Sequence, residues 1–398
     1  MATILLVWEM GGGMGHLVKL QPLALELARR GHRVFLALRD LSRAKHLFPA
    51  DDLTFLQAPY KNDARHAIEP AFTFAQILHN SGFGDPDELA ALVGAWQFIY
   101  RHVAPDLIVF DHSPMAMLAA QTCRARKLLL CTGFACPVDE APLRNLRPWM
   151  NPDAGQLRTD EARVLANMNH VLATFSGLLL DRVSQLFHRV DSTFLATLPE
   201  LDHYPDRVNG NYVGIWPAVE CTAKRPEWPS SSGKRIFAYL KPFVALPDLL
   251  RLFGNLPHSI LVHGDGLNRQ VCARFQAPNM RFEEQPLNLA QVREDCDLAI
   301  LNGGHSSTVE MLLARKPVFV IPLYLEQTLT GHAVAKLGAG ICESPKNAQQ
   351  FATQLQSMLA DDGYRQAAAS FAAKYRDVDR TCKLHALIDH AETLATRR

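Results

Sequence analysis

Two glycine-rich turns hold the side chains of this sequence whose types and spacing suit chemistry. The first is Gly11-Gly12-Gly13-Met14-Gly15-His16, which follows the apolar run Ile4–Trp8 and ends in a histidine. A histidine, with an unperturbed pKa of about 6.5, suits proton removal near neutral pH. Asp111 follows another apolar run, 107–110, and is the carboxylate best placed to orient that imidazole. The structural alternatives are a turn capped by His16 and a helix capped by Asp111.

The second turn has the composition of an anion-binding site. The apolar run Leu298–Leu301 leads into Asn302-Gly303-Gly304-His305-Ser306-Ser307, and a helix is expected over Ser306–Arg315. The first turn of such a helix exposes amide N–H groups and the positive end of the helix dipole, which favour a phosphate. Glu310 lies four residues after Ser306 on the same helical face, where a carboxylate suits paired sugar hydroxyls.

Glu326 and Gln327 follow the expected strand Val318–Ile321 and offer adjacent acid and amide groups to the hydroxyls of a sugar ring. A solvated loop is the alternative for this pair. The standard nucleotide motifs do not match, because the first turn lacks the Lys of a phosphate loop and has His16 where the dinucleotide fingerprint needs glycine. His305 and His332 have no partner at metal-ligand spacing, so no metal site is predicted.

Short apolar strands alternate with helices along the chain, which predicts an α/β fold of two Rossmann-like, doubly wound parallel-sheet domains. The 398 residues exceed what one hydrophobic core usually supports. Both glycine-rich turns fall at the carboxyl edge of a sheet, where open parallel sheets bind ligands, so the two domains are expected to face a cleft. The expected strands are 4–8, 34–38, 107–110 and 128–130, then 236–240, 260–263, 298–301 and 318–321.

Changes in composition predict the domain boundaries. Pro226, Pro229 and the serines 230–232 indicate a linker over 218–233. An acceptor-binding domain over 1–217 and a donor-binding domain over 234–378 would flank it, and the segment 379–398 is expected to form a helix that packs back on the N-terminal domain. Within the first domain, aromatic and methionine side chains are candidates either for an apolar pocket or for ordinary core: Phe72, Phe74, Phe83, Trp96, Phe98, Phe134, Trp149 and Met150.

Charge and cysteine content exclude several classes of protein. The formal net charge of +1 gives no electrostatic footprint for nucleic acid. The eight cysteines form no C-x-x-C pair, and the N-terminus lacks the pattern of a signal peptide, so a cytoplasmic protein is expected. No membrane-binding segment is signalled, although peripheral contact stays open, and a monomer and a homodimer are both compatible with the sequence.

At this point the chain resembles a known family, the two-domain nucleotide-sugar glycosyltransferases of the GT-B fold, in their UDP-glycosyltransferase-like branch that glycosylates small molecules. The resemblance extends over nearly the whole chain, and its most specific part is the block from Asn302 onward. The matching segments are Gly15-His16, Pro22-Leu23-Ala24, Leu27, 30–34, 198–201, 212–214, Asn302–Glu310, 316–317, Pro322, Glu326-Gln327 and 337–340.

The resemblance implies that His16 deprotonates an acceptor hydroxyl with help from Asp111. It implies that Gly303, Gly304, Ser306 and Ser307 hold the donor diphosphate, that Glu310 binds the ribose hydroxyls, and that Glu326 and Gln327 bind the transferred sugar. A UDP- or dTDP-sugar would be the donor and co-substrate, with no other cofactor and no metal, and displacement would invert the anomeric carbon.

Two positions depart from the family pattern. Asn302 stands where the family usually has a histidine that touches the diphosphate, and His305 is the residue placed to compensate. Glu326 replaces the usual aspartate. Three alternatives to the leading hypothesis remain: transfer to a lipid-linked acceptor, a nucleotide-sugar epimerase of the same architecture, and a nucleotide-sugar-binding protein whose catalysis is impaired.

Overall fold

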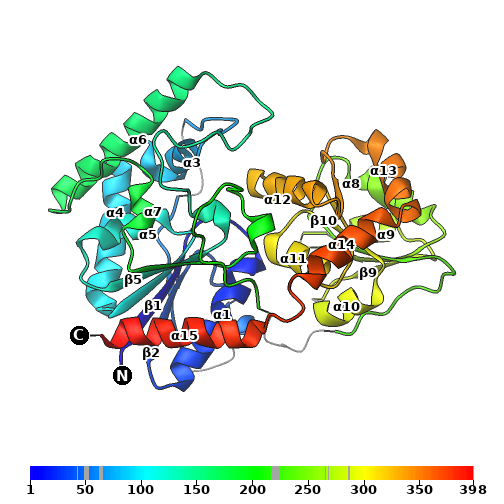
Figure 1. Ribbon diagram of the computed structural model, residues 1–398, viewed down its shortest axis with the longest axis horizontal. Helices are drawn as coiled ribbons and strands as arrows, with labels where there is room; N and C mark the ends of the chain where they lie inside the picture. The colour runs from blue at the N-terminus through cyan, green and yellow to red at the C-terminus, as the bar shows by residue number, and fades with distance from the viewer. Residues whose placement is uncertain are drawn as a thin grey trace. The chain divides into compact units, whose positions relative to one another are not determined.

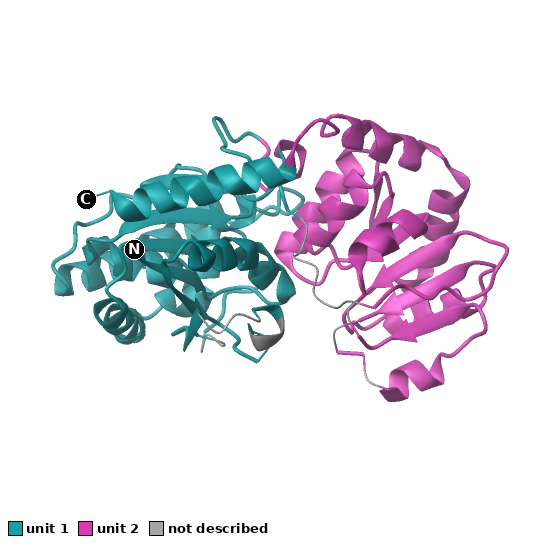
Figure 2. Cartoon of the chain, turned by 90° about the horizontal axis from the view of Figure 1, so that it is seen from below, with its two compact units in different colours: residues 1–198, 206–219, 380–398 teal, residues 199–205, 220–379 magenta. Residues whose placement is uncertain are grey.

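The computed structural model describes residues 1–42, 44–48, 53–61, 66–216, 224–264, 266–267, 269–285 and 287–397. This described chain divides into two compact units (Figure 2). Unit 1 comprises residues 1–198, 206–219 and 380–398, and unit 2 comprises residues 199–205 and 220–379. Each unit contains one parallel sheet with helices packed on it (Figure 1), so the predicted α/β class with two doubly wound domains is confirmed.

The sheet of unit 1 has, among the described residues, six parallel strands in the order β3-β2-β1-β4-β5-β6. Its central strands β1 and β4 are uniformly buried apolar runs, because helices cover both of their faces. The strands are β1 (Thr3–Trp8), β2 (Arg33–Leu38), β3 (Leu53–Gln57), β4 (Leu107–Asp111), β5 (Arg126–Cys131) and β6 (Ser192–Leu195).

The helices of unit 1 bring the catalytic candidates to the carboxyl edge of that sheet. The first of them starts directly after Gly13, whose φ of 112° suits glycine alone. The helical segments are α1 (Met14–Arg29), α2 (Ala44–Leu47), α3 (Phe74–Leu78), η1 (His79–Phe83), α4 (Pro86–Val103), α5 (Pro114–Ala119), η2 (Ala120–Thr122), η3 (Gly133–Ala135), α6 (Ala154–Thr174), α7 (Gln185–His188) and α15 (Arg380–Thr396).

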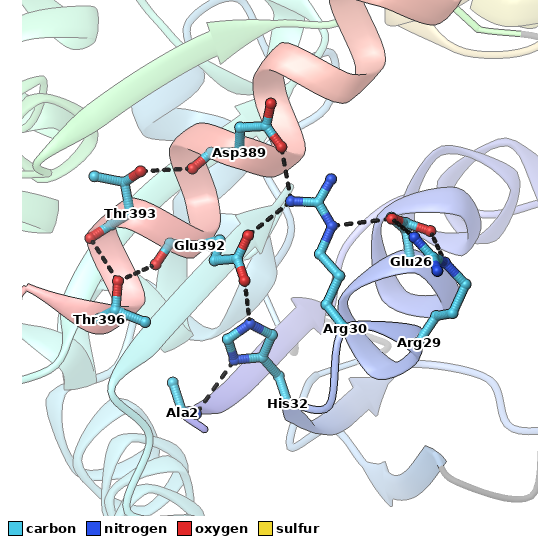
Figure 3. Close-up of polar contacts among 9 residues, drawn as sticks. All are labelled: Ala2, Glu26, Arg29, Arg30, His32, Asp389, Glu392, Thr393 and Thr396. Atoms are coloured by element: carbon cyan, nitrogen blue, oxygen red, sulfur yellow. Dashed lines mark hydrogen bonds and ion pairs between the residues drawn. The ribbon is translucent and has the colours of Figure 1, made fainter.

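Helix α15 packs beside α1 and completes the core of unit 1 (Figure 1). Its buried Leu387, Ile388 and Ala391 belong to the same hydrophobic cluster as Leu20 and Leu27 of α1. Ion pairs fix the contact at its rim (Figure 3). Arg30 donates to Asp389 and to Glu392 at 2.7 Å each, and Nε2 of His32 lies 2.8 Å from Glu392.

Unit 2 repeats the architecture, with a described sheet of six parallel strands in the order β12-β11-β10-β7-β8-β9. Its strands are β7 (Arg235–Tyr239), β8 (Ser259–His263), β9 (Met280–Glu283), β10 (Leu298–Leu301), β11 (Val318–Val320) and β12 (Gly340–Cys342). Its helical segments are η4 (Pro199–Leu201), α8 (Leu246–Gly254), α9 (Arg269–Arg274), α10 (Leu289–Asp295), α11 (His305–Leu313), α12 (Leu325–Lys336), α13 (Ala348–Ala360) and α14 (Gly363–Ala373).

The two compact units do not coincide with the expected domains. The segment 199–205 groups with unit 2, although it was expected within the domain 1–217. The reason lies in its contacts, since Glu200 accepts hydrogen bonds from Lys374 and Tyr375, and His203 bonds to Thr330. Part of the expected linker 218–233 lies outside the described residues. Within the described ranges, no helix combines the length and the apolar character needed to cross a bilayer.

Candidate functional site

His16 and Asp111 meet at the carboxyl edge of the first sheet. Asp111 is the last residue of β4, and its register partner Trp8 is the last residue of β1. His16 lies in the first turn of α1, and its Nδ1 is 2.9 Å from Oδ2 of Asp111. The residue that precedes helix α5 is Ser113, so Asp111 is not a helix cap.

The carboxylate fixes the orientation and the tautomer of the imidazole. An ionised carboxylate only accepts hydrogen bonds, so Nδ1 of His16 carries the proton and Nε2 keeps its lone pair. Burial raises the pKa of Asp111, but the charges of Lys19 and His16 outweigh it and hold that pKa below its usual 3.8. The His16 ring also stacks on Trp8, with centroids 5.1 Å apart and planes at 16°. The arrangement holds the lone pair of Nε2 in one fixed orientation.

Gly11 provides the space beside Nε2. Its φ is +80°, and a Cβ added there would lie 2.7 Å from Nε2 of His16. Of the glycines expected to matter, Gly12 and Gly15 have nothing within 4 Å of an added Cβ, whereas Gly13 needs its positive φ to begin α1. The close approach to the imidazole therefore belongs to Gly11, which the sequence places in the same turn.

Replacing Gly11 by alanine is expected to lower the transfer rate, because the new methyl group collides with Nε2 and the backbone is strained. A displaced imidazole of this kind costs about 100-fold in kcat/KM. Gly12→Ala is the matched control, since its added methyl meets no neighbour. Steady-state kinetics of the two purified variants makes the comparison, and equal activities would contradict the steric role of Gly11.

Sequence reasoning missed two residues beside this pair, Lys19 and His112, and a buried carboxylate, Glu9, that follows β1. Nζ of Lys19 lies 2.5 Å from Oδ1 of Asp111, and both side chains are almost completely buried. His112 follows Asp111 with φ +46°, and its ring centroid is 6.0 Å from that of His16. The Glu9 carboxylate accepts from the first amides of α5, and burial raises its pKa to about 8 although those hydrogen bonds lower it. A lysine three residues after His16 on an otherwise apolar helix face was the available signal.

The aromatic and methionine candidates differ in burial. Phe74, Phe83 and Trp96 are buried completely or almost so and belong to the core of unit 1. Phe98, Trp149 and Met150 are exposed. Phe134 is buried, with its ring edge-on to His112 at 6.0 Å. Half-buried Phe72 has no ring contact among those the structure describes. Phe74 and Phe134 both lie against the His112 ring, with centroids 6.3 Å and 6.0 Å away, and His112 in turn lies beside His16.

In unit 2, the turn after β10 leads directly into helix α11, as expected. Gly303 has φ +82°, and a Cβ added there would lie 2.8 Å from Val320 and 3.0 Å from the carbonyl oxygen of Gln327. Gly304 is exposed and precedes the helix, and Ser307 donates to its carbonyl oxygen at 3.0 Å. Ser306 is half-buried in the same helical turn. By helix geometry the amides of residues 305–307 have no acceptor within the helix, so this turn has the donors that bind a phosphate.

Asn302, directly after β10, bonds through its side chain to the loops that follow the two neighbouring strands, β7 and β11. Its Oδ1 accepts from the backbone N–H of Lys241, which follows β7, at 2.6 Å. Its Nδ2 donates to the carbonyl oxygen of Ile321, which follows β11, at 2.8 Å. Both ends of the buried amide thus bond to the backbone of the loops that form the carboxyl edge of the second sheet. These two hydrogen bonds fix the position of the turn that follows Asn302.

The other donor candidates lie on the same edge of the second sheet. Glu310 is buried on α11 and forms an ion pair with Arg293 of α10. Oε1 of Gln327 accepts from the backbone N–H of Leu323 at 2.8 Å, which fixes the start of α12, and Glu326 precedes it in the first turn. His305 is buried at the start of α11, with its ring centroid 5.6 Å from that of His203.

Comparisons with known proteins identify the architecture. No protein-family model matches the sequence. A PGL/p-HBAD biosynthesis glycosyltransferase of Mycobacterium tuberculosis is 22% identical over 354 residues, which cover 80% of this chain and 78% of the relative. Similar solved structures include the glycotransferase of kitacinnamycin, with a TM-score of 0.74, 18% identity and 99% of each chain covered.

Two further solved glycosyltransferase structures are similar to this chain over nearly its whole length. The calicheamicin glycosyltransferase CalG4 has a TM-score of 0.71 at 18% identity, with 100% of this chain and 99% of that chain covered. VinC, a glycosyltransferase in complex with dTDP, has a TM-score of 0.67 at 17% identity, with 98% and 99% covered. The chain has the GT-B fold of these glycosyltransferases. The predicted fold is thereby confirmed, and the predicted resemblance to glycosyltransferases recurs in the sequence relative and in the solved structures.

In this chain, the candidate residues fall into two sets, each within its own unit. His16, Asp111 and the glycine turn lie in unit 1, and the residues from Asn302 to Gln327 lie in unit 2. Within the described part of the chain, no three His, Cys, Asp or Glu side chains are grouped so that they could hold a metal ion.

Proposed function

We propose that this glycosyltransferase moves a sugar from a UDP- or dTDP-sugar to a hydroxyl of a small, apolar acceptor, with inversion at the anomeric carbon. The observation that carries the proposal is the hydrogen bond between His16 and Asp111, which leaves Nε2 as the base. The base removes the acceptor proton as the hydroxyl oxygen attacks the anomeric carbon. Asp111 stabilises the imidazolium that forms, and the nucleoside diphosphate leaves. The nearby Phe134 and His112 rings support an apolar acceptor.

The donor would be held by unit 2. The amides and hydroxyls at the start of α11, with Gly303, Gly304, Ser306 and Ser307, are placed to bind the diphosphate. Glu310 would bind the ribose hydroxyls, and Glu326 and Gln327 would bind the transferred sugar. Asn302 and His305 would hold the diphosphate-binding turn in place. A thymidine or uridine diphosphate is the proposed leaving group, and VinC binds dTDP.

Negative charge develops on the departing diphosphate, and preorganised donors at a helix N-terminus stabilise such charge. We therefore propose that transfer needs no metal ion. The expected result is an unchanged initial rate in excess EDTA, and a rate that falls in EDTA and recovers with Mg²⁺ would contradict it.

The experiment that tests the proposal screens UDP- and dTDP-sugars by thermal shift and then assays transfer with each binder. A donor present at 100 times its dissociation constant raises the unfolding free energy by about 2.7 kcal/mol. Apolar phenols and macrolides serve as acceptors, and NMR of the product gives the anomeric configuration. We expect an inverted glycoside of a free small molecule.

Three other outcomes would overturn parts of the proposal. Product formed only with acceptors in lipid vesicles would indicate a lipid-linked acceptor. A changed sugar still attached to its nucleotide would indicate an epimerase. Tight donor binding without hydrolysis or transfer would indicate a binding protein.

A further inference from the structure

The cluster around the base contains a third charged group, which the pair of His16 and Asp111 does not need for proton removal. Lys19 lies three residues after His16, on the same face of α1. Its Nζ is 2.5 Å from Oδ1 of Asp111, while Nδ1 of His16 is 2.9 Å from Oδ2. The exposed fractions of the Lys19 and Asp111 side chains are 9% and 1%. The two carboxylate oxygens of Asp111 therefore bind different side chains, Oδ1 to Lys19 and Oδ2 to His16. Because the Lys19 and Asp111 side chains are buried, water screens the interaction between their charges only weakly.

We propose that Lys19 is a positioning residue that sets the pH range in which His16 acts as a base, which rests on the function proposed above. In an Asp-His pair without a third charge, the full negative charge of the carboxylate stabilises the imidazolium. With Lys19 in place, the ammonium already neutralises that charge, so protonation of His16 makes the cluster net positive. The Lys19 charge therefore opposes the build-up of positive charge on the neighbouring imidazole.

Lys19 also keeps Asp111 in its working state. A carboxylate buried this deeply is desolvated, which favours its neutral form. The Lys19 charge is the largest of the influences that lower the pKa of Asp111 against this desolvation. The hydrogen bond to Oδ1 also fixes the rotation of the carboxylate, so that Oδ2 points at Nδ1 of His16.

The other groups around the cluster come from four elements. Trp8 of β1 is stacked on His16 and carries no charge. The titratable groups of the cluster and its surroundings are Lys19 of α1, Asp111 of β4, His112 after β4, and the thiol of Cys131 on β5. Burial raises the pKa of Cys131 far above the neutral range, so that thiol stays uncharged. Lys19 is thus the permanently charged cation in contact with Asp111.

The test compares the pH profile of kcat/KM for the wild type, Lys19→Met and Lys19→Arg. Without the ammonium, Asp111 has only His16 as its counter-charge and holds the imidazolium proton more tightly. In the pH profile of kcat/KM for Lys19→Met, the acidic limb is expected to shift to higher pH by about one pH unit. Activity then falls about tenfold on that limb and approaches the wild-type value on the alkaline plateau, whereas Lys19→Arg keeps the wild-type limb.

Lys127→Met is the matched control, because Lys127 bonds to the backbone carbonyls of Cys123 and Ala125 at the far edge of the sheet. It should leave the profile unchanged. A loss in Lys19→Met that is equal at every pH, or no loss at all, would show that Lys19 has only a structural role and would overturn the proposal.

Two further measurements separate this proposal from the function itself. The NMR titration of the His16 ring in the free protein needs no turnover, and its midpoint should rise in Lys19→Met even if transfer proves to use another base. Loss of transfer in His16→Ala without that rise would overturn only the role of Lys19. If Lys19→Met unfolds, Lys19→Met/Asp111→Asn should regain folding, because it removes both charges; a double variant no more stable than the single one would refute the coupling.

Discussion

His16→Ala is expected to lower kcat/KM for glycosyl transfer by about 10²- to 10⁴-fold, which is the range that a positioned general base contributes. The methyl group cannot take the acceptor proton, while the donor residues lie in the other unit and keep their geometry. Donor affinity should therefore be unchanged, and nearly the whole loss should appear in kcat. Steady-state kinetics with a binder from the donor screen, together with a thermal shift on the same variant, measures both quantities.

His385→Ala is the control for the loss of an imidazole, because His385 is exposed on α15. It should retain full activity. Transfer by His16→Ala at more than a tenth of the wild-type rate would rule out His16 as the base. A weakened donor thermal shift in His16→Ala, with kcat unchanged, would instead assign His16 to donor binding.

Asp111→Asn is expected to have a comparable effect on catalysis and a larger effect on stability. An asparagine has one acceptor oxygen, and the Lys19 ammonium, which can only donate, takes it. The amide N–H then faces Nδ1 of His16 and moves the ring proton to Nε2, which can no longer act as a base. A wrong tautomer of this kind costs up to about 10⁴-fold in kcat. The Lys19 charge loses its counter-charge, which should lower the unfolding free energy by about 3–5 kcal/mol.

Asp106→Asn provides the isosteric control, because Asp106 directly precedes β4. Asp106 lies at the other end of β4, where its carboxylate accepts from the N–H of Thr3, and the asparagine oxygen can replace that contact. Urea denaturation and kinetics of both variants are to be compared at the same pH. Full activity of Asp111→Asn at a pH where it is folded would mean that the carboxylate does not orient the base.

The central strands of both sheets could be predicted from the sequence, whereas the edge strands could not. The strands β1, β4 and β10 are continuous buried apolar runs, and they lie in the middle of their sheets. The strands that sequence reasoning missed are β3, β6, β9 and β12, which form the two edges of each sheet. An edge strand buries fewer side chains, so half-exposed residues interrupt its apolar pattern.

The candidate site was predictable where one element carries it. Gly11 to His16 and Asn302 to Glu310 each form a turn into a helix, and both turns occur as expected. The partners that cross between elements were not predictable. The contact of Lys19 with Asp111 depends on how α1 lies over β4, and the stacking of Trp8 on His16 depends on how α1 lies against the end of β1. The pairing of Glu310 with Arg293 has the same origin.

Asn302 shows how a departure from a family pattern can be explained by local geometry. From the sequence, it is a neutral amide at the position of a diphosphate-binding histidine. In the structure, the side-chain amide of Asn302 bonds to the backbone of Lys241 and Ile321. It thereby connects the loops on either side of the turn at Gly303 and Gly304. A side chain with both a donor and an acceptor at this separation is what the position requires.

Helix α15 has a consequence for how the protein is made. Its buried Leu387, Ile388 and Ala391 are part of the core of unit 1, yet they follow the whole of unit 2 in the chain. A ribosome that adds 5–20 residues per second needs on the order of ten seconds to synthesise the intervening unit. Throughout that interval the nascent first unit exposes the apolar face that α15 will cover. Unit 1, which carries His16 and Asp111, therefore begins to emerge before unit 2 and is completed after it.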